Sequence, residues 1–416
     1  MASRTRVISQ NKAVYVTPTG WDVTGTGANI THQTINGHQL HRVDTLSFDM
    51  DLAGARQDVR EFGQLARIGT VSLTEINPTL SLGYFLVDGE NELALGFTQS
   101  KTGNGGHTGQ MASGMLVEDP ILSERNVWVL TAKEGEDAFN SAVYDAQAQN
   151  HDVIGFGNCF ISSYSASFGV GEIPRADVEL QASNIVFWTG SHNGLYNPSL
   201  DLEGERNFTG LTNLPAPDTG DMSTLVLRPQ DVSVTFSNDD VLAESSSIGG
   251  ATSLSALPVQ SASVELPLAR EVIESLGTEL AYAKLLEFPI DVTLSVSALM
   301  REFGAGGLEY ALTGTAGDKK TDITLDVSNG SKSMVKYKLK NAVLDNQSFS
   351  QGLDDNETVD LTFSAQIGGA STTDQGLFFF TDIGISIPEI EEDEFGSVPS
   401  IAGGPPAAAQ PITPQV

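Results

Sequence analysis

An internal repeat constrains the architecture of this chain more than any single motif does. Residues 43–52 can be laid on residues 259–268 at an offset of 259 − 43 = 216, and from residue 56 onward the offset is 270 − 56 = 214. A second block, residues 158–182, lies on residues 341–365 at an offset of 341 − 158 = 183. The identities include Arg56/Arg270, Gly63/Gly277, Thr79/Thr293, Ser165/Ser348, Gly169/Gly352 and Asp177/Asp360. Because both blocks keep the same order, they predict that one unit is duplicated.

The repeated blocks have the period of β-strands. Residues 43–50 place Leu46, Phe48 and Met50 on one face, and residues 79–85 alternate in the same way. Composition agrees, because 42 of the 416 residues are glycine and because Thr, Ser and Val are plentiful. The sequence therefore predicts a mainly β protein.

Two stretches predict short helices beside the strands. In residues 137–149 the apolar residues follow the i, i+3, i+4 and i+7 spacing of one helix face. Residues 279–286 form the second candidate, which Pro289 would end. Each repeat is therefore expected to carry a flanking helix.

The negative charge of the chain argues against binding of nucleic acid through its phosphates. The sequence has 22 Lys and Arg against 53 Asp and Glu, a formal net charge of −31, and its basic residues are scattered. A protein that holds nucleic acid by its phosphates needs a basic face. A single cysteine forms no intrachain disulfide, and we find neither a secretory signal nor an apolar run of the roughly 20 residues of a membrane helix. We therefore expect a protein that is made in a cytoplasm and has no membrane segment.

Residues suited to catalysis or metal binding are few. His32, His38 and His41 lie close in sequence, but no HExxH pattern or cysteine accompanies them, which favours polar loop histidines over a metal site. Cys159 occupies an alternating strand position, where we expect a buried thiol rather than a nucleophile. Because no GxSxG motif is present either, the sequence predicts no catalytic residue, no cofactor and no metal.

Three lysines alternate along one predicted strand. Lys336, Lys338 and Lys340 share a face, and apolar residues point the other way. Lysines on an edge strand discourage sheet-to-sheet aggregation. On a chain of net charge −31 they have a second interpretation, in which they contact acidic residues of a neighbouring copy. Both interpretations stay open at this point.

An ordered set of motifs carries a resemblance to a known family. The motifs are residues 39–48, 56–59 and 62–65, then 77–82 and 88–97, then 160–168, 171–175 and 178–184. In order and spacing the chain resembles the major tail protein of bacteriophages, the subunit of the tail tube. The motifs span about residues 39–190, and the duplication extends a weaker version to about residue 385. The acidic, Pro- and Ala-rich end of the chain is not part of the resemblance.

The resemblance implies a fold and a domain organisation. It implies two tandem, duplicated β-sandwich or barrel-like tube domains, each with a short flanking helix. The first domain is expected over residues 43–215 and the second over 222–385, preceded by an N-terminal arm at 1–42. Residues 386–416, acidic and rich in Pro and Ala, are expected to form a flexible tail.

The resemblance also implies a function. The chain would assemble with itself into trimeric, pseudo-hexameric rings that stack into a hollow virion tail tube, with terminator, baseplate and tape-measure proteins as further partners. DNA would pass through an acidic lumen without specific binding, and assembly would take place in the host cytoplasm. We expect the loops at 53–76 and 267–288 to make subunit or ring contacts. The residues assigned to self-assembly contacts are Arg56, Gly63, Arg270, Gly277, Lys336, Lys338 and Lys340.

Two other classes of protein remain open. Another virion assembly protein, such as a baseplate ring or a capsid decoration protein, shares the acidity and the β content but forms closed rings or binds a shell. A β-sandwich hydrolase that acts on glycans through two carboxylates would add clustered aromatic residues for sugar stacking. The three tryptophans, Trp21, Trp128 and Trp188, are widely spaced, which disfavours the hydrolase.

Overall fold

The structure is a computed structural model. It describes residues 12–19, 23–24, 31–32, 34–50, 56–72, 77–98, 107–116, 123–132, 138, 151–190, 192–199, 211–218, 226–236, 258–273, 283–299, 320–329, 332–350, 358–369 and 372–381. Gly277, the tail predicted over 386–416, and all but residue 138 of the helix predicted over 137–149 lie outside these residues.

The described part of the chain is mainly β, as the sequence predicts, with α1 (Glu90–Leu95) as its α-helix. The short 3-10 helices are η3 (Met111–Gly114) and η4 (Pro229–Asp231). The strands are β1 (Lys12–Pro18), β2 (Val23–Thr24), β3 (Thr31–His32), β4 (Thr34–Asn36), β5 (His38–Leu40), β6 (Val43–Asp49), β7 (Arg56–Val59), β8 (Gly69–Ser72), β9 (Thr79–Phe85), β10 (His107–Gln110), β11 (Arg125–Thr131), β12 (Asp152–Gly169), β13 (Arg175–Gln181), β14 (Asn184–Thr189), β15 (Leu195–Tyr196), β16 (Leu211–Asn213), β17 (Val232–Phe236), β18 (Val259–Pro267), β19 (Arg270–Ile273), β20 (Ala283–Leu286), β21 (Asp291–Leu299), β22 (Thr321–Asn329), β23 (Lys332–Ser350), β24 (Thr358–Gln366) and β25 (Gly376–Thr381).

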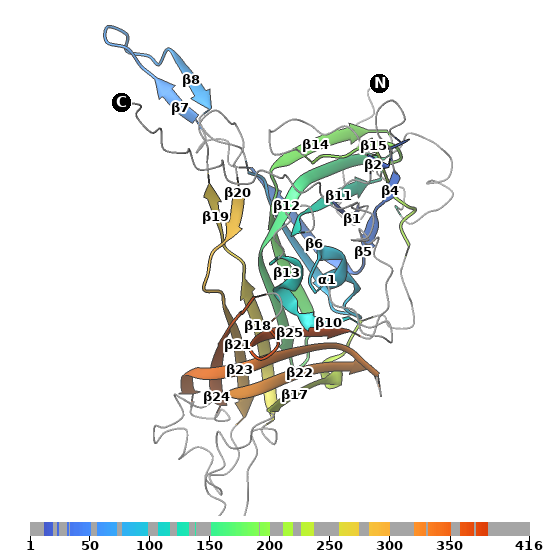
Figure 1. Ribbon diagram of the computed structural model, residues 1–416, viewed down its shortest axis with the longest axis vertical. Coiled ribbons are helices and arrows are strands. Elements are labelled where there is room, and N and C mark those ends of the chain that lie inside the picture. Colours follow the sequence, from blue (N-terminus) through green and yellow to red (C-terminus); the bar gives the residue numbers. More distant parts are fainter. Residues whose placement is uncertain are drawn as a thin grey trace, which may run out of the picture. The chain divides into compact units, whose positions relative to one another are not determined.

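One large sheet connects strands from both halves of the described chain (Figure 1). Its longest path runs β10–β25–β23–β24–β21–β18–β12–β11–β1–β5, and β13, β9 and β6 branch from β12. The long strands β12 and β23 each have different partners along their two parts. β1 falls within the range assigned to an N-terminal arm, yet it pairs along its whole length with β11.

The strand pairing repeats along the chain in the same order and register. The order β6–β9–β13–β12–β11–β1 in the first half corresponds to β18–β21–β24–β23–β22–β17 in the second. Tyr164 pairs with Val178 and Gln347 with Leu361, and both members are offset by 347 − 164 = 361 − 178 = 183 residues. The β7–β8 hairpin between β6 and β9 likewise corresponds to the β19–β20 hairpin between β18 and β21. The offsets found in the sequence are thus also those of the ladders.

Irregularities in the ladders recur at equivalent places. The register of β12 on β13 shifts between Ile161 and Ser163, and that of β23 on β24 shifts between Leu344 and Asn346. Each pair of positions is offset by the same 344 − 161 = 346 − 163 = 183 residues. A bulge inserts an unpaired residue and bends the strand, so both long strands are redirected at the same point.

Two asparagines with left-handed backbone also occupy equivalent positions. Asn158 and Asn341 have φ angles of 51° and 56°. The backbone N–H of Asn158 donates to Asn126 Oδ1 on β11, and that of Asn341 donates to Asp322 Oδ1 on β22. Asparagine tolerates this conformation better than most residues, which explains why both positions carry it.

Both halves contribute to one large hydrophobic cluster among the described residues. Tyr337 on β23 lies edge-on to Phe168 on β12, with ring centroids 6.1 Å apart, and to Phe379 on β25, at 5.4 Å. A smaller cluster surrounds the fully buried Trp128. The predicted boundary between two tube domains therefore does not divide the core of the described chain.

The helices differ from the sequence-based expectations. The sequence signals did not reveal α1, because its six residues between Gly89 and Gly96 are too few to show a helical period. The helix predicted over 279–286 is wrong in its described part, since Ala283–Leu286 is strand β20. Pairing with β19 supplies backbone hydrogen bonds that outweigh a weak local helix preference.

We expect the left-handed backbone of Asn341 to affect the free energy of unfolding. Asn341→Ala and Asn341→Gly both remove the amide that donates to the Asp374 carbonyl at 2.7 Å, but only alanine meets the steric cost of positive φ. Glycine should therefore retain more unfolding free energy than alanine, by roughly 0.5–1 kcal/mol in urea titrations. Equal values for both variants would contradict the assigned backbone conformation.

Candidate functional site

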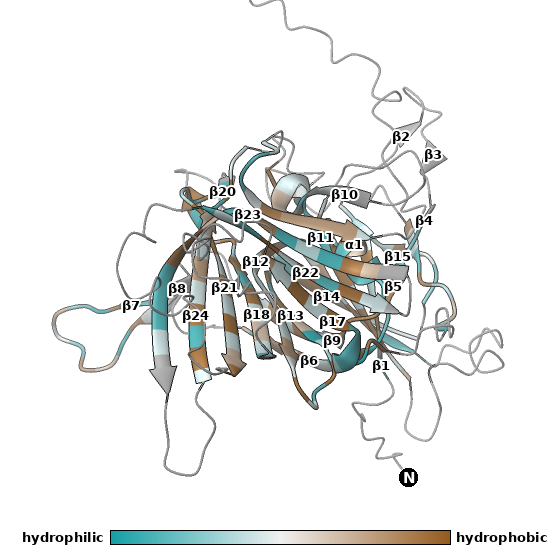
Figure 2. Cartoon of the chain, turned by 90° about the horizontal axis from the view of Figure 1, so that it is seen from below, coloured by the Kyte–Doolittle hydropathy of each residue, from teal (hydrophilic) through white to brown (hydrophobic). Residues whose placement is uncertain are grey.

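The central strands present one polar face. The strands β6, β9, β13 and β12, followed by β18, β21, β24 and the end of β23, alternate between core residues and half-buried or exposed polar ones. Figure 2 shows this alternation as bands of hydropathy along β18, β21 and β24. The hydroxyl residues of the face are Thr45, Ser47, Thr79, Ser81, Ser163, Ser165, Ser167, Ser261, Ser263, Thr293, Ser295, Ser297, Ser348, Thr358, Thr362 and Ser364. We call this surface the polar sheet face.

Acidic residues dominate the charge of the polar sheet face. Its carboxylates belong to Asp49, Asp177, Glu179, Glu265, Asp291 and Asp360. Arg175 is its basic residue in the described strands, and it forms ion pairs with Asp44 at 2.6 Å and Asp177 at 3.0 Å. Short hydroxyl side chains and an excess of carboxylates over basic groups make this surface polar and negative, with a hollow beside Ser263, Ser297 and Asp360. A surface of this charge repels a polyanion.

Two hairpins carry exposed apolar residues. On β7, β8 and the turn between them, Phe62 and Leu65 are fully exposed, and Val59, Ile68 and Val71 are also exposed. On and beside the β19–β20 hairpin, the exposed apolar residues are Val272, Ile273, Leu285 and Phe288. A cluster of large apolar side chains left in water on a short hairpin marks an interaction surface more often than an isolated exposed residue does.

The contact residues predicted from sequence fall on these hairpins in part. Arg56 begins β7, and Gly63, with φ 98°, lies in the turn beside Phe62. Arg270 begins β19, but its guanidinium stacks over the Phe160 ring with Cζ 4.4 Å from the centroid. Burial lowers the pKa of Arg270 to about 10. The Arg270 side chain is therefore held inside the chain, whereas Gly63 lies in the exposed turn.

The three lysines do not lie on an edge strand, so that interpretation is wrong. β23 has β22 on one side of these residues and β25 on the other. Lys336 contacts Asp326 at 2.9 Å and Lys338 contacts Asp322 at 3.3 Å, both on β22. The Lys340 ammonium donates to the Thr373 carbonyl and lies 4.3 Å from the Phe378 ring centroid. Their charges meet partners on the same chain.

A buried carboxylate on α1 joins a hydrogen-bonded cluster of tyrosines from both halves of the chain. Glu92 Oε1 accepts hydrogen bonds from the hydroxyls of Tyr84, at 3.0 Å, and Tyr164, at 3.1 Å. The Tyr164 oxygen lies 2.7 Å from that of Tyr337 on β23. Burial raises the pKa of Glu92 to about 7, although both tyrosine hydrogen bonds oppose the shift. We call these four residues the Glu92 cluster.

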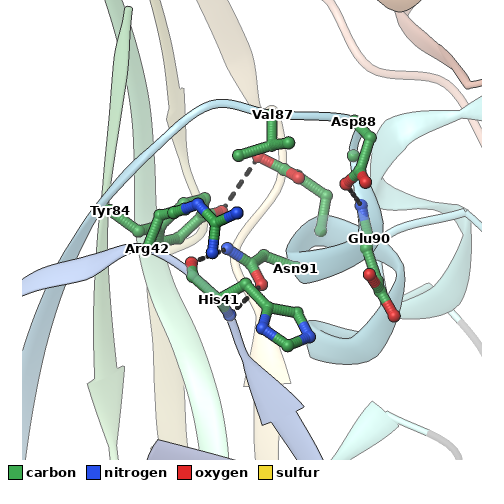
Figure 3. A pocket seen from close by; sticks show the side chains of 9 residues that line it. His41, Arg42, Tyr84, Val87, Asp88, Glu90 and Asn91 are labelled. Atoms are coloured by element: carbon green, nitrogen blue, oxygen red, sulfur yellow. Dashed lines mark hydrogen bonds between the residues drawn. The ribbon is translucent and has the colours of Figure 1, made fainter. Parts of the chain in front are cut away.

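Other titratable groups near α1 have structural partners. His38 Nε2 lies 3.3 Å from Glu90 Oε1, and this contact lowers the pKa of Glu90. The His41 backbone exchanges two hydrogen bonds with the Asn91 side chain, as Figure 3 shows. Cys159 is buried, as predicted, and burial raises the pKa of its thiol. Within the described ranges, no group of three or more His, Cys, Asp or Glu side chains is arranged to hold a metal ion.

Comparison with known proteins leaves the function to be argued from this geometry, because no protein-family model and no curated protein matches the chain. Among the described residues, no helix is long and apolar enough to span a membrane.

The sequence signals missed two parts of the site. The apolar residues of β7 and β8 lie in a stretch that the sequence predicts to be a loop. Val59 pairs with Gly69 and Val71 with Gln57, and strands of four residues with one valine each are too short to show a two-residue period. Nothing local marks Glu92 as buried, since Tyr164 and Tyr337 come from positions far apart in the chain.

We expect Glu92 to make folding stability depend on pH. Its folded-state pKa, near 7, exceeds the ordinary value of 4.5, so the folded state binds the proton more tightly and loses stability as pH rises from about 4.5 through 7. Glu92→Gln removes this loss. Relative to wild type, the unfolding free energy of the variant should rise between pH 5 and pH 8, by a few kcal/mol at most.

The matched control is Glu179→Gln, which removes an exposed carboxylate of the polar sheet face. Chemical denaturation of the three proteins at both pH values provides the comparison. If the difference in unfolding free energy between Glu92→Gln and wild type is the same at pH 5 and pH 8, the raised pKa of Glu92 is contradicted.

Proposed function

We propose that this chain is a structural virion protein that assembles with itself into the stacked rings of a phage tail tube. Three chains form each ring, and each chain supplies two tube domains, so that a trimer has pseudo-sixfold symmetry. The proposed role is structural rather than catalytic. Tail terminator, baseplate and tape-measure proteins are its further virion partners, and the host cytoplasm is where it assembles.

The observation that carries the proposal is the continuous polar sheet face built by equivalent strands of both halves. Equal registers, equal bulges and equal left-handed asparagines support a gene-level duplication of one tube domain. A subunit with two equivalent units needs half as many copies to complete a ring. The duplicated unit, in this proposal, begins at β1 and β17 rather than at residue 43, because β1 pairs on β11 as β17 pairs on β22.

The charge of the face supports its role as the wall of a conduit. Six carboxylates against the ion-paired Arg175 repel phosphates, so DNA in contact with such a wall gains no binding energy that would slow it. Serine and threonine hydroxyls keep the wall hydrated and free of large protrusions. A grip on DNA would instead need basic side chains that release counterions on binding.

The β7–β8 hairpin supports stacking of one ring on the next. It follows the C-terminal end of β6, whereas the turn between β12 and β13 lies at the opposite end of the ladders. That turn also exposes apolar residues, Val170 and Ile173. Apolar surfaces at both ends of the strands are complementary in a head-to-tail stack of copies.

Negative-stain electron microscopy of the concentrated protein tests this function. We expect hollow tubes, or rings with threefold symmetry, from the wild-type chain. Closed rings that never stack would instead favour a baseplate ring, and binding to capsid shells without rings would favour a decoration protein. Either result would contradict the tube.

Phe62→Ser combined with Leu65→Ser should separate folding from stacking. Both side chains are fully exposed, so their loss should leave the unfolding transition unchanged while tubes shorten or disappear. Gln64→Ser, in the same turn, is the matched control and should assemble like wild type. Tubes of normal length from the double variant would exclude this hairpin as the stacking contact.

A further inference from the structure

Among the described residues, the β12–β18 ladder joins the two halves of the chain through their polar sheet face, in addition to the β10–β25 ladder. Along Ser163–Gly169 of the long strand, β12 pairs with β18, which belongs to the second half. The register sets Ser165 opposite Glu265 and Ser167 opposite Ser263 on the polar sheet face. This ladder joins the C-terminal part of β12, in the first half, to β18, in the second half.

Because the ladders repeat, two other strand edges in the chain are equivalent to the edges of β12 and β18 that pair with each other. β6 corresponds to β18, and among the described residues it pairs only with β9. β23 corresponds to β12, and its end, residues 346–350, has β24 on one side but no described strand on the side where β12 receives β18. Each chain thus displays one edge of each kind. Open strand edges of this kind attract another strand.

We infer that the end of β23 pairs antiparallel with β6 of a second copy of this chain, in the register of the β12–β18 junction. The inference rests on the proposed function and identifies the partner strand and its alignment. Adding 183 to a β12 position and subtracting 216 from a β18 position converts Ser165↔Glu265 into Ser348↔Asp49. The same conversion of Ala166↔Val264 places residue 349 opposite Phe48.

The chemistry of the converted pairs supports this register. A serine faces a carboxylate in both junctions, at Ser165 with Glu265 and at Ser348 with Asp49, so the polar sheet face continues across the contact. One residue along, Phe48 is 41% exposed although it belongs to the core side of β6. A strand added at β6 would cover part of that ring, and a shift by one residue would turn the polar side chains toward the core.

The pairing is of the head-to-tail kind and closes only in a ring. One chain offers β23 and receives at β6, so every added copy leaves the same two edges open until the last copy meets the first. In a closed ring neither β6 nor the end of β23 is an open edge, which removes the aggregation hazard that these two edges give each free chain.

A disulfide between the paired positions tests the register. Asp49→Cys and Ser348→Cys in one chain change exposed residues, and directly opposed strand residues have Cα atoms about 4.5–5.5 Å apart, within disulfide range. Under oxidising conditions we expect covalent dimers and trimers on non-reducing gels that disappear with reductant. Cys159 is buried with a raised thiol pKa and should not compete.

The matched control combines Ser348→Cys with Ser47→Cys, on the same face but two residues out of register, where Cα atoms are roughly 8 Å apart. It should cross-link at least tenfold less, and each single-cysteine variant alone should give no ladder. Two results would overturn the register but not the proposed tube. One is rings that assemble while the Asp49/Ser348 cysteine pair does not cross-link, and the other is equal cross-linking in the control. A chain that neither cross-links nor associates at millimolar concentration would overturn both.

Discussion

The ladder between β12 and β18 is the interaction on which the rest of the described structure depends. It makes strands of both halves neighbours in one sheet, so that their apolar residues join one core and their polar residues one face. Without it, β12 and β18 would each expose a line of unpaired backbone groups and a strip of core. Because the flanking ladders repeat with equal registers, the same contact also defines which edges of the chain stay open.

Contacts behind the sheet reinforce this junction. The Glu92 cluster links α1, β9 and β12 of the first half to β23 of the second through hydroxyl and carboxylate oxygens. A buried carboxylate is costly to ionise, so burial favours the protonated form of Glu92, whereas the two tyrosine hydrogen bonds favour the ionised form. On β23, Lys336 and Lys338 form half-buried ion pairs with aspartates of β22, which neutralises charge between these two strands.

The acidity of the protein has a structural cost and a functional consequence. Carboxylates gathered on one face repel one another, and this repulsion opposes assembly at low ionic strength. In the proposed ring the repulsion is offset by backbone hydrogen bonds and by apolar surface covered at the strand edges and hairpins. In the proposed tube, the same negative surface would repel DNA from the wall.

Local pattern was enough to predict the strands but not how they are joined. Alternation marked β6 and β9, and the offsets of 216, 214 and 183 residues matched the ladder registers, because strand period and strand length are encoded locally. The lysines of β23 were interpreted as edge residues because no local signal shows that β22 and β25 flank them. Helix α1 and the burial of Glu92 were missed for related reasons: one is too short to show a period, and the other depends on tyrosines far away in sequence.

In the proposed assembly, the polar sheet face is the inner wall. A three-dimensional electron cryomicroscopy reconstruction of assembled particles tests it most directly, since it locates strands relative to the symmetry axis. We expect β18, β21 and β24 of every copy to turn Ser263, Ser295 and Thr362 toward the axis, with acidic side chains beside them. A reconstruction in which this face is buried against another copy, or in which a basic surface lines the lumen, would contradict it.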